Sequence, residues 1–312
     1  MKGPDVCILI VTWNGKDILK KCLGSLIRST DYTNYRIVIV DNGSIDGTFE
    51  YVKQNFQDSD VYRIEKNQGY AKACNKGLDY VIIKYNPKYI VTSNNDIEFI
   101  QKEWLSKLVE NAESDKKIGA ASPKLLYPDG TIQSAWTIID PKPWKFFINN
   151  YGRKKQDTEE FSVIKEVDFL TGACSLFSTE AINKVGLLDE NYAPGWLEDT
   201  DYCFKLKKAG FKLLYNGTSK VIHYESMSTI KREPENEESF FIKRRNMFYF
   251  LFKYFHIFDV IPQAIMLLLD SVFSMTFLRV RGKAHLKLLL TIKALKEAKS
   301  LVQIRQQKFN KL

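Results

Sequence analysis

The chain has 312 residues, of which 45% are apolar and 27% are charged. A chain of this length and composition can bury a sizeable core, which excludes a mostly disordered protein. The net charge of +9 lies in the C-terminal tail, because residues 279–312 carry ten Lys and Arg residues and a single acid, Glu297. The rest of the chain is close to neutral, so we expect the tail to meet any anionic partner.

The cysteines and the first apolar run indicate the cellular compartment in which the protein is expected. Five cysteines form no C-x-x-C pair and lie among apolar residues, which is typical of buried thiols in a reducing compartment. The apolar run from Val6 to Trp13 is short and lacks the cleavage site of a signal peptide, so we interpret it as a buried strand. These features predict a cytoplasmic protein.

Apolar runs alternate with amphipathic stretches along the first third of the chain. In chain order these pairs are Val6 to Thr12 and Ile18 to Ile27, Arg36 to Val40 and Thr48 to Phe56, Val61 to Ile64 and Ala71 to Ile83, and Tyr89 to Val91 and Trp104 to Ala112. The alternation predicts an α/β fold with a mostly parallel, Rossmann-like sheet flanked by helices. Ligands of such sheets bind beyond the carboxyl ends of the strands, where polar clusters follow here.

The pattern is less regular from Ile118 to Glu166, where four prolines predict an irregular stretch at the surface. Regular elements return after it. The expected strands are Phe169 to Ser178, Phe211 to Tyr215 and Ser219 to His223, and the expected helices are Thr179 to Val185 and Glu198 to Ala209.

The character of the chain changes after the polar segment from Lys231 to Glu238. An apolar stretch, Met247 to Leu278, and a basic amphipathic stretch, Ala284 to Val302, predict a helical C-terminal appendage. We therefore predict a main domain over residues 1–228 and a helical, basic region over residues 229–312.

The segment Asp41-Asn42-Gly43-Ser44 places a carboxylate at a strand end before a Gly-rich turn. A carboxylate there can accept hydrogen bonds from a nucleotide base or ribose. A turn of this composition is also common without a ligand. The chain has no G-x-G-x-x-G after the first strand and no G-x-x-x-x-G-K-[ST], so a dinucleotide fingerprint and a P-loop are both absent from the sequence.

The segment Asn94-Asn95-Asp96 follows another expected strand. One carboxylate with amide oxygens beside it is a partial site for a hard divalent cation that bridges a diphosphate. A helix cap is the alternative interpretation of the same residues.

Three acids, Glu198, Asp199 and Asp201, fall in the first turn of an expected helix. The helix dipole favours acids there, but three exceed the need of a cap. Because adjacent residues on a helix do not share a face, only one of Glu198 and Asp199 is expected to reach a substrate atom. We predict Asp199 as the general base, a role that suits a carboxylate ionised at neutral pH.

His223 follows an expected strand and is the one histidine of the three outside the apolar and basic appendage. It is a candidate to ligate the metal or to bind phosphate, and a hydrogen-bonded structural histidine is the alternative.

Eight motifs in this order closely resemble family 2 glycosyltransferases, especially the rhamnosyltransferase-like branch, over roughly Val6 to Ser228. They are VTWN, VDNGSIDGT, NQGYAKACNKG, SNND, FLTGACSLF, GLLDENY, LEDTD and VIHYESMS. The resemblance implies a GT-A catalytic domain and transfer with inversion at the anomeric carbon. It also implies Mg²⁺ or Mn²⁺ bound through Asp96, although Asn94 stands where an acid is often found.

The resemblance further assigns residues to the donor, the base and the acceptor. The residues implied for the nucleotide sugar are Thr12, Asn14, Asp41, Asn67, Gly69, Asn75 and Asn95. Asp199 is again the base, and His223 contacts the metal or diphosphate. Thr171, Gly172 and Trp196, with Glu198 beside them, are expected around the acceptor. Arg244 and Arg245 match an Arg-Asn element and suit a diphosphate, with a solvated helix face as the alternative.

These inferences predict an inverting glycosyltransferase that uses a UDP- or dTDP-linked sugar, with rhamnose suggested only by the branch. The expected acceptor is a hydroxyl of a glycan or a lipid-linked molecule in cell-surface polysaccharide synthesis. A catalytically weak, sugar-nucleotide-binding scaffold is the alternative. The basic tail is expected to contact the cytoplasmic membrane surface, or else to be a solvated face or a homo-oligomer interface. Nucleic acid is not an expected partner, because the aromatic residues are not interleaved with Lys and Arg.

Overall fold

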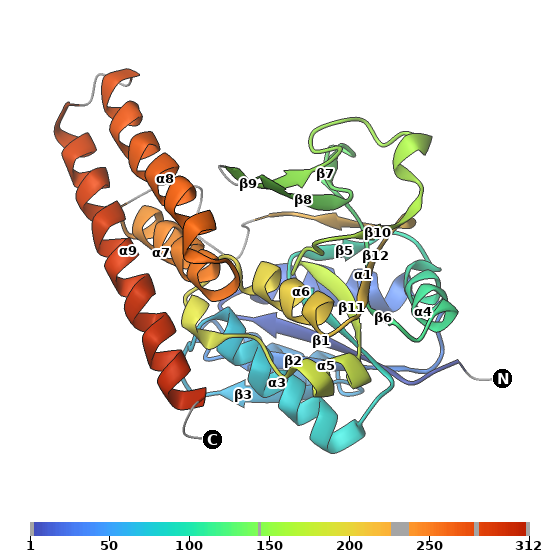
Figure 1. Cartoon of the computed structure of the whole chain (residues 1–312). Helices are drawn as coiled ribbons and strands as arrows, with labels where there is room; N and C mark the ends of the chain where they lie inside the picture. The colour runs from blue at the N-terminus through green and yellow to red at the C-terminus, as the bar shows by residue number, and fades with distance from the viewer. Residues whose placement is uncertain (1–2, 143–144, 226–236, 278–280, 310–312) are drawn as a thin grey trace. The chain divides into compact units, whose positions relative to one another are not determined.

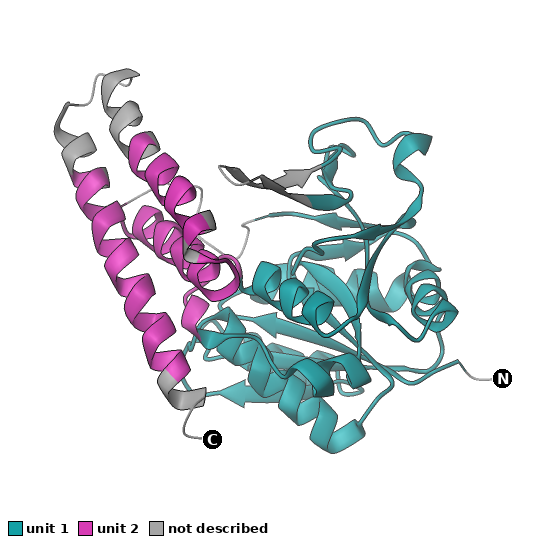
Figure 2. Cartoon of the chain, viewed as in Figure 1, with its two compact units in different colours: residues 1–138, 149–190, 198–231 teal, residues 139–148, 191–197, 232–312 magenta. Residues whose placement is uncertain are grey.

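The computed structural model describes residues 3–142, 145–225, 237–277 and 281–309. The chain forms two compact units. Unit 1 comprises Met1–Ile138, Asn149–Glu190 and Glu198–Lys231, and unit 2 comprises Ile139–Ile148, Asn191–Leu197 and Arg232–Leu312 (Figure 2). The expected boundary between residues 228 and 229 lies outside the described residues and stays a prediction.

Unit 1 is built on a mixed, mostly parallel sheet in the order β10-β12-β6-β11-β4-β1-β2-β3, with β5 beside β12 and β7 beside β6 (Figure 1). The strands are β1 (Val6–Thr12), β2 (Tyr35–Asn42), β3 (Asp60–Ile64), β4 (Tyr89–Asn94), β5 (Ile97–Phe99), β6 (Ile118–Leu126), β7 (Ile132–Ser134), β10 (Ile164–Val167), β11 (Cys174–Ser178) and β12 (Lys212–His223). Strands β1 to β4 are parallel, whereas β11 runs antiparallel between β4 and β6. A separate pair consists of β8 (Thr137–Lys142) and β9 (Lys145–Asn150).

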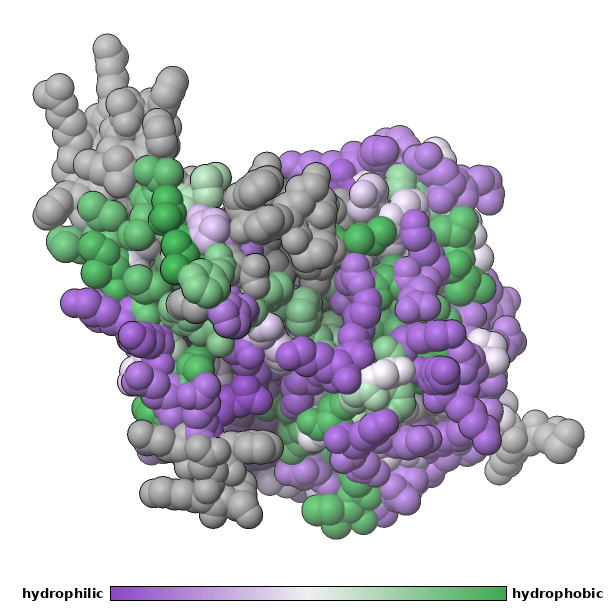
Figure 3. Space-filling view, viewed as in Figure 1, coloured by the Kyte–Doolittle hydropathy of each residue, from purple (hydrophilic) through white to green (hydrophobic). Residues whose placement is uncertain are grey.

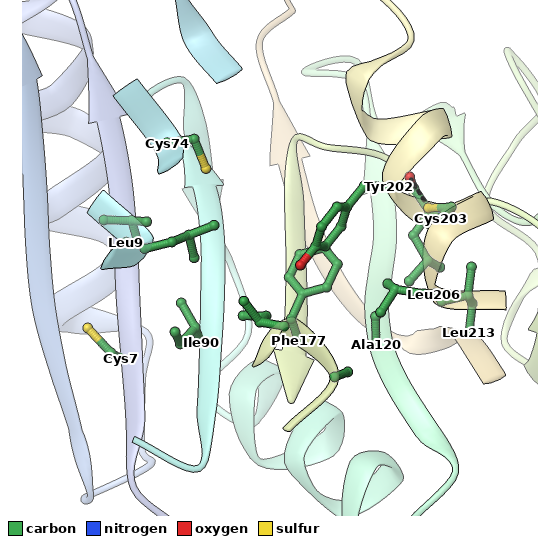
Figure 4. Packing of buried hydrophobic residues seen from close by; sticks show 14 of the residues in the cluster. Cys7, Leu9, Cys74, Ile90, Ala120, Phe177, Tyr202, Cys203, Leu206 and Leu213 are labelled. Atoms are coloured by element: carbon green, nitrogen blue, oxygen red, sulfur yellow. Dashed lines mark hydrogen bonds between the residues drawn. The ribbon is translucent and has the colours of Figure 1, made fainter. Parts of the chain in front are cut away.

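Helices cover both faces of this sheet. They are α1 (Lys16–Arg28), α2 (Thr48–Asn55), α3 (Tyr70–Tyr85), α4 (Trp104–Ser114), α5 (Thr179–Val185) and α6 (Glu198–Lys208), with single 3₁₀ turns at Glu159–Phe161 and Glu190–Tyr192. Side chains alternate along β1, so that Cys7 and Leu9 pack in the core beneath α3, α5 and α6 while Ile8 packs with α1 and α4. Figure 4 shows the first of these cores. The expected parallel sheet flanked by helices is confirmed.

The expectation of an irregular surface stretch from Ile118 to Glu166 was wrong, because this stretch holds β6 to β9 and most of β10. The contrast is strongest at its start. Residues 118–126 form β6, which is buried along its whole length between β11 and β12. A fully buried strand has no polar alternation to reveal it. Pro123 and Lys124 also obscured it. Pro123 is tolerated because the pairing of β6 with β12 shifts register directly after it.

Two further expectations are corrected at the boundaries of strands. The strand expected from Phe169 begins only at Cys174, which leaves the preceding residues in a loop. The two strands expected around residues 216–218 are one strand, β12, because a bulge accommodates the Gly217 region without ending the ladder.

Unit 2 contains the long helices α7 (Glu237–Tyr254), α8 (Ile257–Phe277) and α9 (Arg281–Phe309), as expected for a helical appendage. Thr291, Ala294 and Ala298 form the buried stripe of α9, at a spacing that keeps them on one face. Within residues 3–142, 145–225, 237–277 and 281–309, the helices lack the combination of length and hydrophobicity that crossing a bilayer requires.

Candidate active site

The backbone and the side chain of Asn14 connect the loops after β1 and β2. Its backbone N–H donates to Ser44 Oγ at 2.9 Å, and Ile45 N–H donates to Asn14 Oδ1 at 2.9 Å. Asn14 adopts a φ of 47°, a left-handed conformation that Asn tolerates better than most residues. On the other side of β1, Asn95 Nδ2 donates to Thr12 Oγ1 at 2.8 Å. Thr12, Asn14 and Asn95 therefore meet at one edge of the sheet.

Asp41 is buried at the end of β2 with only one of its oxygens in use. Oδ1 accepts the Ser44 N–H at 3.1 Å. Oδ2 is buried without a hydrogen-bond partner in the described part of the chain, although Arg63 Nε lies 3.7 Å away. A buried carboxylate oxygen left open in this way is suited to accept an N–H or O–H from a ligand.

The loop after β3 approaches Asp41 closely, and Gly43 makes this possible. Gly43 has a φ of 79°, and a Cβ there would lie 2.7 Å from the Asn67 nitrogen. Asn42 Nδ2 donates to Asn67 Oδ1 at 3.0 Å, and the same oxygen accepts the Gly69 N–H at 2.9 Å. Asn67 and Gly69 are thus brought to the edge that carries Asp41.

Asn75 lies elsewhere, within α3. Its amide bonds both the N–H and the C=O of Leu188, at 2.9 and 3.0 Å, and reaches Glu190 Oε1 at 3.0 Å. These contacts anchor the segment around residues 188–190, and they engage both ends of the Asn75 amide within the protein.

Asp96 and His223 meet because β5 pairs with the end of β12, with Ile97 opposite His223. His223 Nε2 lies 3.1 Å from Asp96 Oδ1 and 3.5 Å from Asn94 Nδ2. Asp96 Oδ1 is buried, and despite this short distance it has no hydrogen bond of acceptable geometry to a described residue.

This pair fits a divalent cation. Two ligands at adjacent octahedral positions, each about 2.1 Å from Mg²⁺, are about 3.0 Å apart, close to the separation of Asp96 Oδ1 and His223 Nε2. The chemistry also fits, since carboxylate oxygen and imidazole nitrogen are common ligands of such metals. Among the residues that the structure describes, no cluster of three or more His, Cys, Asp and Glu side chains is suited to a metal.

The first turn of α6 carries Glu198 and Asp199, and their surroundings differ. Gly172 N–H donates to Asp199 Oδ2 at 3.2 Å, and Thr200 N–H donates to Oδ1 at 2.7 Å. Glu198 Oε2 has no hydrogen-bond partner among the described residues. A Cβ on Gly172 would lie 3.2 Å from Asp199 Cβ, so this approach favours glycine. Thr171 precedes it and accepts the Ala173 N–H at its side chain.

Burial raises the pKa of both carboxyl groups. The pKa of Glu198 is raised by burial first and by the neighbouring Asp199 charge second. Burial also raises the pKa of Asp199, against the lowering effect of the Gly172 and Thr200 hydrogen bonds. Asp199 borders a small, mainly apolar cavity of about 30 Å³. The donors around Asp199 favour its charged form, so it is the better candidate to be ionised.

Trp196, Arg244 and Arg245 belong to unit 2. Arg245 donates to the carbonyls of Asn191 and Ala193, to Asn246 Oδ1 and to Glu297 Oε1. The Arg244 guanidinium lies 5.0 Å from the Phe240 ring centroid. Trp196 is 47% exposed, with Lys243 Nζ 4.9 Å from its ring centroid. In the structure, Arg245 is engaged by the 191–197 loop.

Several residues at these positions were not anticipated. Gln133 contacts His223, Ser44 and Arg63 surround Asp41, and Asn246 binds the 191–197 loop. Ser44 and Asn246 belong to segments singled out from the sequence, but no such contact was assigned to either residue. Gln133 lies in the stretch expected to be irregular, and a polar residue there carries no sequence signal of a partner 90 residues away.

Solved structures confirm the expected GT-A fold. A structure of GalNAc-T7 with UDP, GalNAc and Mn²⁺ matches with a TM-score of 0.65 at 17% identity, over 93% of this chain and 55% of that chain. The mannosyltransferase PcManGT from Pyrobaculum calidifontis, in complex with GDP-Man and Mn²⁺, matches with a TM-score of 0.56 at 15% identity, over 98% and 80% of the two chains.

Sequence relatives include an uncharacterized protein, y4gI, of Sinorhizobium fredii, 27% identical over 78% of this chain. The O-antigen biosynthesis protein RfbC of Myxococcus xanthus is 24% identical over 72% of it. This chain spans only 28% and 18% of those two relatives. It spans 76% of the N-acetylglucosaminyl-diphospho-decaprenol L-rhamnosyltransferase of Mycobacterium tuberculosis, which is 24% identical over 71% of this chain.

The family model of glycosyl transferase family 2 matches residues 7–186, which is more than half of the chain. With the order of motifs and the rhamnosyltransferase relative, this match places the protein in the family: the chain belongs to glycosyl transferase family 2 and is similar to its rhamnosyltransferase members.

Proposed function

We propose that the chain transfers a sugar from a nucleoside-diphosphate donor to an acceptor hydroxyl, with inversion at the anomeric carbon and with help from a divalent metal. The observation that carries the proposal is the pair Asp96 Oδ1 and His223 Nε2, 3.1 Å apart without a hydrogen bond. A bound Mg²⁺ or Mn²⁺ would neutralise charge on the leaving diphosphate, whose oxygens would complete its shell.

The donor nucleotide would lie along the edge formed by Thr12, Asn14, Asp41 and Asn67. Asp41 Oδ2 is the buried acceptor available there for a base or ribose donor group. We assign no direct donor contact to Asn75, because its amide is engaged by Leu188 and Glu190.

Asp199 would act as the general base. Its carboxylate would accept the proton of the acceptor hydroxyl as that oxygen attacks, while Gly172 and Thr200 hold the carboxylate in place. Thr171, Gly172 and Glu198 adjoin it, and we propose them as neighbours of the acceptor. We also propose Trp196 and Arg244 for the acceptor or diphosphate.

Rhamnose as the donor sugar and a lipid-linked acceptor in polysaccharide synthesis are supported by the name of the Mycobacterium tuberculosis relative. UDP and dTDP are the nucleoside diphosphates of the donors to test first. We further propose that the protein works at the cytoplasmic face of the membrane, through the exposed apolar and basic residues of α8 and α9.

The test is release of the nucleoside diphosphate from a panel of UDP-, dTDP- and GDP-sugars with EDTA or with added Mn²⁺. We expect metal-dependent release with one donor class, and its loss in Asp96→Asn. Asp58→Asn, an exposed carboxylate in the same unit, is the matched control and should not change the rate. Equal release by wild type in EDTA and Mn²⁺ would contradict the metal assignment.

A scaffold that binds sugar nucleotide without transfer is the second candidate. It is favoured by Asn94, a neutral amide where the family often has an acid, which lies 3.5 Å from His223 Nε2. Metal-dependent binding of a donor without hydrolysis or transfer over the whole panel would support the scaffold over the enzyme.

A further inference from the structure

Gln133 is a buried side chain of β7 that contacts His223 at two points. Gln133 Nε2 donates to the His223 backbone oxygen at 3.3 Å, and Gln133 Oε1 lies 2.6 Å from His223 Nδ1. Strand β7 pairs with β6, and β6 pairs with β12, so the sheet itself brings these residues together.

The backbone contact fixes which way the Gln133 amide faces. A carbonyl oxygen can only accept, so the NH₂ group must face the His223 carbonyl. The Oε1 atom then faces the imidazole, and this oxygen can also only accept. Nδ1 must therefore carry a hydrogen. In the neutral ring, Nε2 is left with its lone pair directed to the side of Asp96.

We infer that Gln133 is a positioning residue that selects the Nδ1–H tautomer of His223, so that Nε2 and Asp96 Oδ1 present two lone pairs to one divalent cation. The inference rests on the proposed function, because it needs the metal at this pair. In this tautomer two acceptor atoms lie 3.1 Å apart, and a cation held between them would remove their repulsion.

The first measurement is Mn²⁺ affinity, followed by the EPR signal of free Mn²⁺ with the full-length protein, with and without UDP or dTDP. We expect Gln133→Met, which keeps the size but not the acceptor, to weaken binding by roughly 10- to 100-fold. Gln133→Glu keeps an oxygen acceptor for Nδ1–H but loses the donor to the His223 backbone oxygen, so we expect it to restore most of the affinity while the unfolding midpoint falls.

A matched control separates this role from a general loss of packing. Gln101 Oε1 accepts the Lys220 N–H of the same strand at 2.7 Å, three residues before His223. Gln101→Met should lower the unfolding midpoint as Gln133→Met does, but should leave Mn²⁺ affinity within twofold of wild type. Equal losses of affinity in both Met variants would overturn the inference.

The second measurement is the tautomer itself, by long-range ¹H–¹⁵N NMR of the imidazoles. The chain has only three histidines, so His223→Gln identifies the signal. We expect the Nδ1–H pattern in wild type and Gln133→Glu, and its loss in Gln133→Met. An Nε2–H pattern in wild type would overturn the inference.

Failure of the proposed function is distinguishable from failure of this inference. If Asp96→Asn leaves Mn²⁺ affinity unchanged, the metal site is wrong, whatever Gln133 does. If Asp96→Asn abolishes binding while Gln133→Met leaves both affinity and tautomer unchanged, the metal site stands and the role of Gln133 is wrong.

Discussion

At the scale of single residues, two adjacent carboxylates in the first turn of α6 receive unequal support. Asp199 accepts backbone N–H groups from Gly172 and Thr200, whereas Glu198 Oε2 is buried without a partner in the described residues. Burial raises the pKa of both carboxyl groups, but only Asp199 has backbone hydrogen bonds that favour its charged form against this effect. The two acids are therefore suited to different roles although they share one turn.

Asp199→Asn tests the role of the base. The change keeps the size of the side chain but removes the group that takes the acceptor proton. We expect transfer to fall by roughly 10²- to 10⁴-fold while the dissociation constant of the donor changes less than threefold. Product formation and donor titration measure the two quantities. Undiminished transfer in the variant would eliminate Asp199 as the base.

Glu198→Gln tests the buried acid through pH. Folding raises the pKa of Glu198 above its ordinary value of 4.5. Above pH 4.5 the unfolded chain therefore releases this proton, while the folded protein still holds it. The contribution of Glu198 to the free energy of unfolding therefore falls as the pH rises above 4.5. We expect Glu198→Gln to match wild type near pH 4 and to become relatively more stable toward pH 8 in thermal melts. A constant difference between the two proteins across this range would contradict the raised pKa.

The sequence singled out Asp199 as a candidate but did not predict which residues surround it in the fold. Helix geometry limited the base to one of Glu198 and Asp199, which is local information, and the order of motifs pointed to Asp199, whose role stays a prediction. Gly172 and Gln133 acquire their partners only when β11, α6, β7 and β12 assemble. Such pairings depend on strand order, which a single sequence does not encode in any local pattern.

At the scale of elements, the 191–197 loop is shaped by one side chain of α7. Asn246 Nδ2 donates to the carbonyls of Tyr192, Gly195 and Trp196 at 2.8, 2.6 and 2.9 Å. Trp196 and Leu197 have φ values of 70° and 72°, which cost non-glycine residues about 1–3 kcal/mol each. These contacts support a strained loop that continues directly into Glu198 and Asp199.

Asn246→Asp should release this loop. The carboxylate would face three carbonyl oxygens with no hydrogen to donate, so we expect a loss of about 3 kcal/mol in unfolding free energy. Amides of residues 191–197 should also exchange hydrogen faster, as measured by mass spectrometry. Asn55→Asp, on an exposed helix end, is the control and should change stability by less than about 0.5 kcal/mol. Unchanged exchange in Asn246→Asp would show that other contacts hold the loop.

Only part of the order of strands and helices could be predicted from the sequence. Strands β1 to β4 and their helices were expected because each strand is a short apolar run bounded by turn residues. Strand β6 was missed because Pro123 and the fully buried Lys124 resemble a loop in sequence. Lys124 is accommodated by Asp157, the Phe161 carbonyl and Ser162, partners that only the folded chain supplies.

At the scale of the whole molecule, unit 2 exposes an apolar face on two helices. The exposed side chains of α8 are Phe258, Ile261, Ile265, Met266 and Leu269, and those near the start of α9 are Leu289 and Ile292. Their spacing places each set on one helix face. Lys293, Lys296 and Lys299 are exposed further along the same face of α9. Figure 3 shows hydrophobic side chains gathered over the coloured part of α8 and the adjoining part of α9, with hydrophilic ones below them.

A lipid surface matches this order of side chains. Apolar residues that enter the boundary of the acyl chains gain about 25 cal/mol per Å² of buried surface, and each Lys near an anionic headgroup adds about 1 kcal/mol. On α9 the lysines follow Leu289 and Ile292, so one membrane face can contact both the apolar and the basic side chains. A second copy of the chain would gain from the apolar residues but would place like charges together.

We therefore predict that the full chain floats with vesicles of phosphatidylcholine and phosphatidylglycerol at 70:30, and much less with phosphatidylcholine alone. Phe258→Gln with Ile265→Gln should abolish flotation, because the two apolar side chains can no longer enter the lipid. Both positions are exposed, so the changes should not unfold the protein. Replacing Lys293, Lys296 and Lys299 by Gln should remove the preference for anionic lipid. The opposite outcome is a protein that does not float and that sediments as a dimer. If the Phe258 and Ile265 changes dissociate that dimer, the apolar face binds a second copy of the chain and not a membrane.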